Sequence, residues 1–477
     1  MKKTFHYKNN IRVVGLALFL AVTGCTKLVE VDPPLTSISG DVVFTSDATA
    51  ISAVNAIYTT MSSQGMNNGL TSLSQFAGLS ADEFKVADNV SDQLYTSYYT
   101  NSLTSTNTTG NDFWMNIYSS YLFIVNSSIE GLTDNALVSE AVRNQLLGEC
   151  FFLRAFSYFY LVNLYGDVPL VLSSDYKKNS NIGRSPKAKV YDQIVTDLKN
   201  AETLLNTNYV DNSKVTSTSK RVVPNKAAAK ALLSRVYLYG KDWGNAENKA
   251  SEVIEDKGLY DTVPVHAVFL VDSKEVIWQI QSVSDIYTNA AEAYLFKLPP
   301  TGPDPYSYRV YLSENINQYI SYDDKRRSWV DSVMVGSLVY YFPVKYKNNE
   351  SFSPVTEYSV VMRLAELYLI RSEARTHLNK TIEALSDLNV IRQRAGVASI
   401  QSGSQDQILN KILQERRSEL FTEWGHRWLD LKRTGKATAI LQPVKGASWT
   451  INDELYPIPQ ADININLGLR GQQNPGY

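Results

Sequence analysis

The chain has 477 residues, a formal net charge of −2 at pH 7 and 44% hydrophobic residues. This length permits two or three domains with a large core, and the nearly neutral charge gives no electrostatic basis for binding nucleic acid. The 30 tyrosines, against 16 phenylalanines, favour surfaces that hold polar ligands, because tyrosine combines an apolar ring with a polar tip.

The first 24 residues have the layout of a secretory signal peptide. A basic start precedes an apolar segment at 13–22, which is too short for a bilayer span of ~20 residues. The stretch VTGC that follows resembles a bacterial lipobox, so we expect lipidation of Cys25 and anchoring through its acyl chains. An ordinary signal peptide with an incidental cysteine is the alternative. Lipidation would leave Cys150 without a disulfide partner, and the prolines of residues 25–46 favour an extended tether.

Helical patterns follow the tether. Residues 47–61 place apolar side chains near one face, and residues 62–111 break this pattern. A polar loop at 102–112 precedes further predicted helices at 112–129, 140–165, 190–205, 225–239 and 245–256. The helix at 140–165 is apolar nearly all round, so we expect it to be buried, with Cys150 as a small core residue.

The last two of these helices form a pair with repeat-like features. The pair carries alanines at contact-like spacings, and two antiparallel helices in about 34 residues match the tetratricopeptide repeat period. The usual repeat signature is only partly present. Such repeats stack into a curved scaffold. We therefore predict a mainly α fold: a tetratricopeptide-like superhelix of helical pairs, with long irregular loops and a few short strands.

Residues 257–358 differ from the helical part before them. A strand-like segment at 275–281 is followed by a long stretch in which glycine, proline and tyrosine crowd together. Loops of this length are usually functional or disordered, and the aromatic content argues against disorder. We therefore divide the mature chain into an N-terminal helical region, 47–256, and a C-terminal region, 257–477, with a loop-rich insertion at 257–358.

Helices return after this insertion, at 359–378, 381–395 and 405–432. The third places one apolar stripe on a single face, which assigns its members to the core: Leu413, Leu420, Trp424, Trp428 and Leu431. We assign Trp114 and Tyr118, at the start of helix 112–129, to the core as well. The last 23 residues contain too many glycines and prolines for regular structure.

Several of these segments together resemble one family. They are RAFSYFYLVNLYGDVPLV (154–171), RLAELYLIRSEA (363–374), LNVIRQRAGV (388–397), ILQERRSELFTEWGHRWLDLKR (412–433) and YPIPQADININLGLRGQQNPGY (456–477). In this order they are similar to the SusD/RagB lipoproteins of Bacteroidota. The resemblance implies a lipid-anchored protein on the outer-membrane surface that binds a nutrient, commonly an oligosaccharide and in some members a peptide. It also implies a SusC-like TonB-dependent transporter as partner, with no cofactor and no catalysis.

Two segments have the composition of a ligand site. Sugar rings have apolar C–H faces for aromatic stacking and hydroxyl groups for polar side chains, and the family draws its ligand residues from the corresponding regions. In 92–107 the candidates are Tyr95, Tyr98, Tyr99 and Asn101. In 287–329 they are Tyr287, Tyr294, Tyr306, Tyr308 and Trp329. No fixed motif marks individual positions. Core packing is the alternative for each of these side chains.

A glycan-degrading enzyme is the second hypothesis. The predicted helix at 405–432 places acidic residues at four-residue spacing with other titratable groups nearby: Glu415, Glu419, Glu423, His426 and Asp430. Two carboxylates about 5–10 Å apart would suit glycoside hydrolysis. Ion pairing with neighbouring arginines is the alternative, and we favour it. Ligand contact is one interpretation of Asp324, Arg326 and Arg327, and a structural ion pair is the interpretation that we favour.

A protein-binding scaffold without a small ligand is the third hypothesis. No metal site is predicted, because the histidines are isolated and neither a His-x₃-His pair nor a cysteine cluster is present. Calcium held by the irregular loops stays open.

Overall fold

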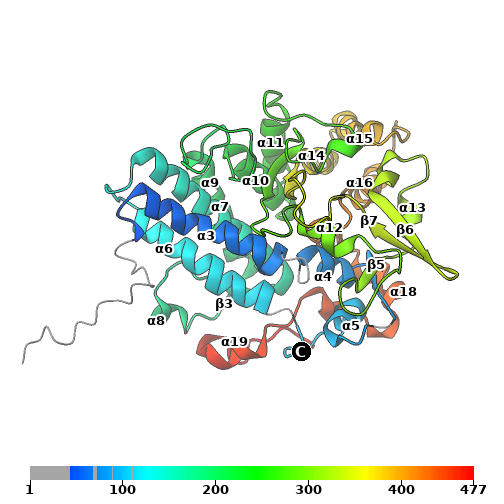
Figure 1. Cartoon of the computed structure of the whole chain (residues 1–477), viewed down its shortest axis with the longest axis horizontal. Coiled ribbons are helices and arrows are strands. Elements are labelled where there is room, and N and C mark those ends of the chain that lie inside the picture. The colour runs from blue at the N-terminus through cyan, green and yellow to red at the C-terminus, as the bar shows by residue number, and fades with distance from the viewer. Residues whose placement is uncertain (1–42, 68–71, 89, 109–110) are drawn as a thin grey trace, which may run out of the picture. The chain divides into compact units, whose positions relative to one another are not determined.

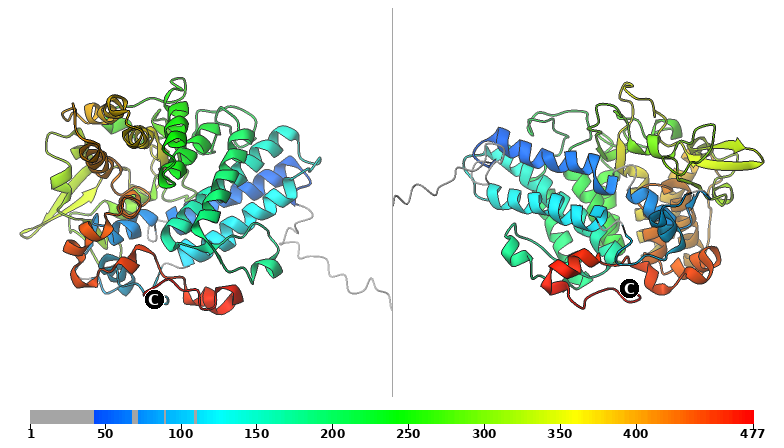
Figure 2. Two further views of the ribbon diagram at one scale, coloured as in Figure 1. Left: turned by 180° about the vertical axis from the view of Figure 1, so that it is seen from behind. Right: turned by 60° about the horizontal axis from the view of Figure 1, so that its bottom comes forward.

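Long helices lying side by side make up the N-terminal part of the fold (Figures 1 and 2). The computed structural model describes residues 43–67, 72–88, 90–108 and 111–477, and Phe44–Tyr477 form one compact unit. The helices are α3 (Asp47–Ser63), α6 (Phe123–Leu132), α7 (Glu140–Tyr165), α9 (Lys187–Leu204), α10 (Lys226–Tyr239) and α11 (Trp243–Ile254). Apart from α6, these confirm the predicted helices to within one turn. The signal peptide, most of the tether and Cys25 lie outside the described residues.

Helix α7 is the core helix that its composition predicts. Nearly every side chain from Val142 onward is buried, including Cys150. The rings of Phe152 and Phe156 meet Trp278 edge-on, with centroids 5.0 and 5.2 Å apart. Gly166, with a φ of 75°, ends the helix in a conformation that favours glycine.

The helical pairs repeat one contact, which supports the superhelix prediction. In α10, the Ser234 hydroxyl donates to the Ala246 carbonyl of α11 over 2.9 Å. In the pair α14 (Leu364–His377) and α15 (Thr381–Arg394), Ser372 donates to Ala384 over 2.7 Å at the same spacing of 12 residues. Small side chains at these crossings let the helices approach closely. The fold is therefore mainly α and is built from stacked helical pairs.

The helix predicted at 112–129 begins with wider turns than expected. Two π-helical segments, η4 (Asn111–Met115) and η5 (Ile117–Leu122), precede the regular helix α6. Trp114 is buried as predicted, whereas Tyr118 is only partly buried.

The prediction of a helix at 359–378 is wrong for its first five residues, 359–363. Its β-branched start forms strand β8 (Ser359–Arg363), which pairs antiparallel with β4 (Val276–Ile280), the predicted strand. Helix α14 starts only at Leu364, because this partner strand takes up the preceding backbone hydrogen bonds.

The predicted helix at 405–432 is two helices, α16 (Gln405–Leu420) and α17 (His426–Arg433). The chain reverses between them through left-handed residues, among them Trp424 and Gly425, whose φ angles are 45° and 70°. A Cβ on Gly425 would lie 2.8 Å from the Cβ of Ala77, so close packing requires glycine there. The apolar stripe is therefore not continuous, although Trp424 and Trp428 are both buried in the core as predicted.

The loop-rich insertion joins a distant segment in one antiparallel sheet. The strand order is β1-β5-β7-β6, formed by β1 (Phe84–Val86), β5 (Val310–Leu312), β7 (Leu338–Pro343) and β6 (Val330–Val335). The register pairs Phe84 with Leu312, so residues near 84 and 312 are held together. Shorter helices flank this sheet: α4 (Leu73–Ser80), α5 (Gln93–Thr100), α12 (Ala291–Phe296) and α13 (Ile316–Tyr319).

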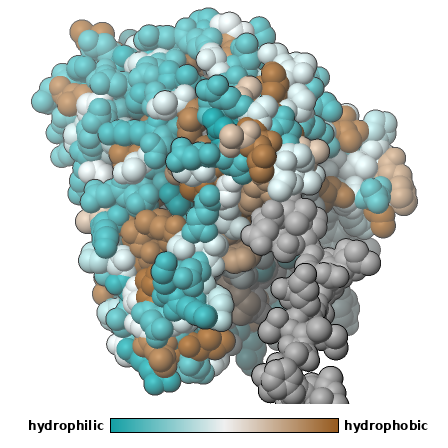
Figure 3. Space-filling model, turned by 90° about the vertical axis from the view of Figure 1, so that its left-hand side faces the viewer, coloured by the Kyte–Doolittle hydropathy of each residue, from teal (hydrophilic) through white to brown (hydrophobic). Residues whose placement is uncertain are grey.

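The C-terminal segment packs back on the core. Helix α18 (Ala437–Lys445) follows α17, and the short α19 (Gln460–Ile465) interrupts a stretch for which no regular structure was predicted. Tyr456 donates its backbone N–H to the Leu164 carbonyl over 2.8 Å, and the Asn474 amide donates to the Tyr165 carbonyl over 2.9 Å. On the face shown in Figure 3, hydrophilic residues predominate and apolar residues form separate patches.

Candidate ligand-binding site

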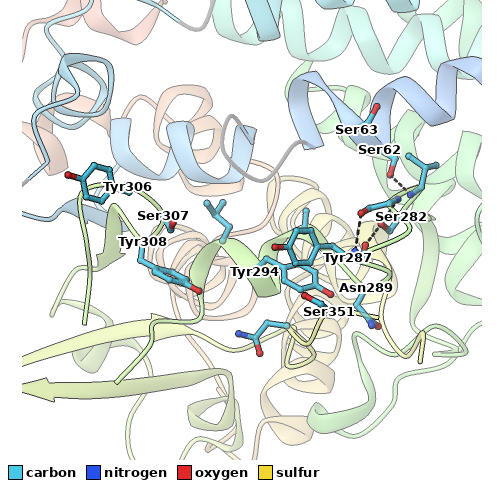
Figure 4. A pocket seen from close by; sticks show the side chains of 15 residues that line it. Ser62, Ser63, Ser282, Tyr287, Asn289, Tyr294, Tyr306, Ser307, Tyr308 and Ser351 are labelled. Carbon is cyan, nitrogen blue, oxygen red and sulfur yellow. Dashed lines mark hydrogen bonds between the residues drawn. The ribbon is translucent and has the colours of Figure 1, made fainter. Parts of the chain in front are cut away.

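A cavity of about 690 Å³ lies between the C-terminal end of α3 and the loop-rich insertion (Figure 4). The 15 residues that line it are hydroxyl, amide, aromatic and aliphatic, and none carries a formal charge. They come from the end of α3 (Ser62, Ser63), residues 282–295, residues 306–308, and Asn349 and Ser351. The pocket therefore suits a neutral ligand that offers both apolar surface and hydrogen-bonding groups.

Two tyrosines form an aromatic pair in this pocket. The ring centroids of Tyr287 and Tyr294 are 4.3 Å apart and the ring planes are tilted by 51°. The Tyr294 hydroxyl donates to the Glu350 carbonyl over 3.3 Å, which ties the short helix α12 to the opposite loop. About half of the Tyr287 side chain is exposed, so one ring of the pair is open for stacking.

The loop that carries Tyr287 is fixed by hydroxyl groups. The Ser282 hydroxyl donates to the Tyr287 carbonyl over 2.6 Å, and the Ser284 hydroxyl accepts from the Tyr287 N–H over 2.9 Å. The Val283 N–H donates to the Ser62 hydroxyl over 3.2 Å, which links this loop to α3. These bonds hold the aromatic pair in place without a ligand.

Asn289 anchors the base of the pocket. It is buried, and its amide donates to the Pro354 carbonyl over 3.1 Å. Its carbonyl oxygen accepts from the N–H groups of Thr356 and Glu357 over 2.8 and 3.0 Å. Because every polar atom of this side chain is used, its role is to join the two loops of the pocket.

Tyr306 and Tyr308 lie on a second loop at the pocket rim (Figure 4). The Asp304 carboxylate accepts from the Tyr306 and Ser307 N–H groups over 2.7 and 2.8 Å, which fixes the turn. Tyr306 is 79% exposed, and Tyr308 is partly buried. Together with Tyr287 and Tyr294, four of the nine predicted ligand residues meet in one pocket.

The four candidates at residues 95–101 lie elsewhere, on and directly after α5. Tyr98 is 0% exposed, and its ring packs against Phe76 and Tyr456 at centroid distances of 4.6 and 5.2 Å. Tyr95 is buried in the same cluster, and the Lys445 ammonium covers Tyr99 at 4.3 Å from the ring centroid.

Asn101 has a structural role at the end of α5. It is buried and caps the helix with a φ of 56°, a conformation that asparagine tolerates. Its segment therefore supplies core and capping contacts, and the structure does not bring these four residues to the pocket.

Trp329 is also a core residue. It is 1% exposed, and its indole N–H donates to the Val265 carbonyl over 3.1 Å. The Lys345 ammonium lies 4.9 Å from its ring centroid. The composition of residues 287–329 could not reveal this, because an aromatic residue serves a core and a ligand site equally well.

The carboxylates of the enzyme hypothesis form a buried ion-pair cluster. Arg363 donates to Glu423 over 2.8 Å and to Glu419 over 2.5 Å, and Arg326 donates to Glu415 over 2.6 Å. Burial raises the pKa of Glu419, but the adjacent arginine charges dominate and hold it well below its ordinary value. Glu419 is 0% exposed, so this carboxylate is closed to a glycan and stabilises the fold.

The cluster extends to Asp324, which pairs with Arg326 over 2.7 Å, as expected for a structural ion pair. Arg327 instead donates to Asn317 over 2.7 Å. Among the described residues, no group of three or more histidine, cysteine, aspartate or glutamate side chains is arranged to hold a metal ion.

Sequence reasoning missed the hydroxyl and amide lining of the pocket. The serines of the lining come from segments far apart in the chain: Ser62, Ser63, Ser282, Ser284 and Ser351. A serine in a loop carries no distinguishing sequence signal.

Across the part of the chain that the structure describes, no helix is long and apolar enough to cross a membrane.

Comparisons with known proteins agree along most of the chain. A family model described as "Starch-binding associating with outer membrane" matches residues 40–238, and one described as "SusD family" matches residues 306–477. "SusD-like protein P2" of Formosa agariphila is 25% identical, with 98% of this chain and 99% of the relative covered.

Solved structures share the fold. A SusD superfamily protein of Bacteroides vulgatus has a TM-score of 0.77 at 19% identity, over 90% of this chain and 99% of that one. A structure titled "Laminarin binding SusD-like protein" has a TM-score of 0.75 at 22% identity, and the match covers 90% of this chain and 99% of that one. Surface glycan-binding protein A of Bacteroides uniformis has a TM-score of 0.76 at 21% identity, with the same coverage of 90% of this chain and 99% of that one. With both family models, the full-length relative and this fold in agreement, the chain belongs to the SusD/RagB family.

Proposed function

We propose that this protein captures a neutral oligosaccharide at the cell surface, in the pocket formed around Tyr287, Tyr294, Tyr306 and Tyr308. The observation that carries the proposal is the uncharged lining of tyrosine rings, serine hydroxyls and asparagine amides in a cavity of about 690 Å³. Tyrosine rings stack on the C–H faces of a sugar, and the tyrosine and serine hydroxyls of the lining, with the Asn349 amide, hydrogen-bond its hydroxyl groups. Two structural neighbours are named for laminarin and for surface glycans, which supports the same ligand class.

The chemistry of the pocket is binding without bond cleavage. The lining holds no carboxylate or histidine to act as a general acid or base. The protein would therefore hold its ligand and release it unchanged. A peptide is the alternative ligand, and the uncharged lining favours one without charged side chains.

Hand-over requires a membrane partner and an anchor. We infer from the family that a SusC-like TonB-dependent transporter receives the ligand, and that acyl chains on Cys25 hold the protein at the outer membrane. Cys25→Ala should release the protein from the membrane fraction, and affinity purification from solubilised outer membranes should recover the transporter with the wild-type protein. Recovery of no transporter would contradict the partner while leaving ligand capture intact.

Calorimetric titration of a chain lacking residues 1–25 tests ligand capture. The panel contains laminarin oligosaccharides, other neutral glycans, uronic-acid glycans and peptides, and each mixture is checked for breakdown products. We expect a neutral glycan to bind without turnover, and Tyr287→Ala or Tyr294→Ala to weaken its binding about fivefold or more, since an aromatic contact contributes ~1 kcal/mol or more. Tyr322→Ala is the control, because Tyr322 is exposed and does not line the pocket.

Three outcomes would overturn the proposal. Turnover would favour the enzyme hypothesis. Unchanged affinity in both pocket variants would place the site elsewhere. Binding of the transporter without binding of any panel member would favour a protein scaffold.

A further inference from the structure

One aromatic ring beside the proposed ligand site belongs neither to the core nor to the pocket wall. Phe352 is 74% exposed and directly follows Ser351, which lines the pocket. Its backbone N–H donates over 2.8 Å to the carbonyl of Ile286, the residue before Tyr287. Phe352 therefore lies at the rim, with its ring open to solvent. The pocket is called the tyrosine pocket below, after its four tyrosines: Tyr287, Tyr294, Tyr306 and Tyr308.

The backbone of Phe352 is in a conformation that a bulky residue rarely adopts. Its φ is 57°, in the left-handed region, where the Cβ crowds the following carbonyl oxygen. Glycine adopts this conformation without that crowding, and it would also remove a large apolar side chain from water. Folding alone therefore favours glycine at this position.

Trp424 is the other aromatic residue with a positive φ among the described residues, and core packing accounts for it. Its side chain is 2% exposed, and its indole N–H donates to the Val360 carbonyl over 3.0 Å. Phe352 has no such burial to offset its backbone strain. Strain of this kind gathers at ligand-binding sites, where the surrounding contacts hold a side chain in a required place.

Hydrogen bonds hold the Phe352 loop against the loop of the aromatic pair. The Thr288 hydroxyl donates to the Ser353 carbonyl over 2.7 Å, and the Asn289 amide donates to the Ser353 hydroxyl over 3.1 Å. Thr288 and Asn289 directly follow Tyr287. The same contacts therefore fix the backbone that carries the exposed ring relative to the stacking residue in the pocket.

We propose that Phe352 is a further stacking residue for oligosaccharides that extend beyond the tyrosine pocket. The pocket would hold one end of the chain, and a later sugar unit that crosses this rim would place its C–H face on the Phe352 ring. The inference rests on the proposed capture of a neutral oligosaccharide and adds to it a preference for longer chains.

The test is calorimetric titration of the chain lacking residues 1–25 with oligosaccharides of two lengths. The probes are the trisaccharides and hexasaccharides of three neutral glucans: laminarin, cellulose and amylose. We expect the wild type to bind at least one hexasaccharide more tightly than its trisaccharide. Phe352→Ala should lower the hexasaccharide affinity about fivefold, or about 1 kcal/mol, and leave the trisaccharide affinity unchanged.

Two further variants identify stacking as the cause. Phe352→Trp keeps an aromatic face and should retain the hexasaccharide affinity, whereas Phe352→Leu keeps only apolar surface and should lose as much as Phe352→Ala. Tyr176→Ala is the matched control and should bind as the wild type does. Tyr176, on α8 (Tyr176–Asn179), is 73% exposed and does not line the tyrosine pocket.

Phe352→Gly separates ligand contact from a structural role. Glycine removes both the ring and the backbone strain, so the thermal unfolding midpoint should not fall while the hexasaccharide affinity falls about fivefold. A clear decrease of the midpoint would show that the ring stabilises the fold and would contradict the inference.

The remaining outcomes distinguish this inference from the proposed function. If the wild type binds none of the hexasaccharides, both fail. If it binds one and Phe352→Ala binds it equally well, only the role of Phe352 fails. An equal decrease for trisaccharide and hexasaccharide would show that the substitution disturbs the pocket itself, which also overturns the inference. Recovery of less transporter with Phe352→Ala, at unchanged glycan affinity, would assign the ring to a protein contact instead.

Discussion

Glu292→Gln should make the protein more stable, and more so at higher pH. Glu292 lies on α12, the helix that carries Tyr294, and its side chain is buried. The Ser359 hydroxyl donates to Oε1 over 2.7 Å, whereas Oε2 accepts no hydrogen bond from the described residues. Burial, aided by the negative charge of Glu423 and opposed by the Ser359 bond, raises the pKa of Glu292 from 4.5 to about 7. The folded state therefore favours the neutral acid, which glutamine resembles in shape and polarity.

The direction of the pH dependence follows from the number of protons that the folded and unfolded states bind. Between pH 4.5 and 7 the folded protein holds a proton on Glu292 that the unfolded chain has lost, so stability falls as pH rises through this window. A shift from 4.5 to about 7 corresponds to about 3 kcal/mol, at about 1.4 kcal/mol for each pKa unit. The advantage of Glu292→Gln should rise from about 1 kcal/mol at pH 5 to about 3 kcal/mol at pH 8.

Urea unfolding followed by tryptophan fluorescence measures this difference. Both proteins are unfolded at pH 5, 6, 7 and 8, and the free energies of unfolding are compared at each pH. Glu350→Gln is the matched control, because this exposed glutamate lies on the loop opposite α12 and should give no comparable trend. A constant difference between Glu292→Gln and wild type across the pH range would refute the argument, because it would show that Glu292 does not change its protonation on unfolding.

Three further predictions concern the C-terminal half. Arg363→Met should destabilise the protein by about 3–5 kcal/mol in urea unfolding, because it removes the cation that Glu275, Glu419 and Glu423 share and leaves them with fewer positive charges in a buried cluster; a decrease below ~1 kcal/mol would contradict this. Burial lowers the pKa of His426 from 6.5 to about 4, so the stability present above pH 6.5 is lost as pH falls toward 4. Between pH 7 and 4.5, the free energy of unfolding of His426→Gln should fall by about 2 kcal/mol less than that of the wild type. An equal fall in both proteins would exclude His426 protonation as the cause. Gly425→Ala should destabilise by about 1–3 kcal/mol, because its φ is 70° and the new Cβ would lie 2.8 Å from the Cβ of Ala77; wild-type thermal stability in this variant would contradict the strain argument.

The proposed binding site, the tyrosine pocket, is formed by loops of a mainly helical scaffold. The stacked helices pack against one another within the helical pairs. The pocket is formed mainly by the loops that connect the helices and strands of the insertion. The bonds of Ser282, Ser284 and Asn289 fix those loops before any ligand arrives. If the pocket binds the proposed oligosaccharide, little conformational entropy is lost, because its loops are already fixed.

The sequence determined the parts of the fold that depend on local patterns. Helix α7 follows from a long apolar run that ends at Gly166, and the α10–α11 pair follows from alanines at contact spacings. The family resemblance, too, follows from the order of the sequence motifs, which are helical segments followed by the C-terminal ending. Composition predicted two ligand segments, 92–107 and 287–329, and only the second contributes residues to the tyrosine pocket.

Only the tertiary structure decided which aromatic residues line the tyrosine pocket. Tyr98 and Tyr287 are indistinguishable in type and local composition, yet α5 packs Tyr98 against Tyr456 while the loop before α12 leaves Tyr287 open. The break at Gly425 and the strand β8 also depend on partners distant in the chain, Ala77 and β4. Local sequence fixes the pattern of a segment, whereas burial and strand pairing are set by what the rest of the chain places against it.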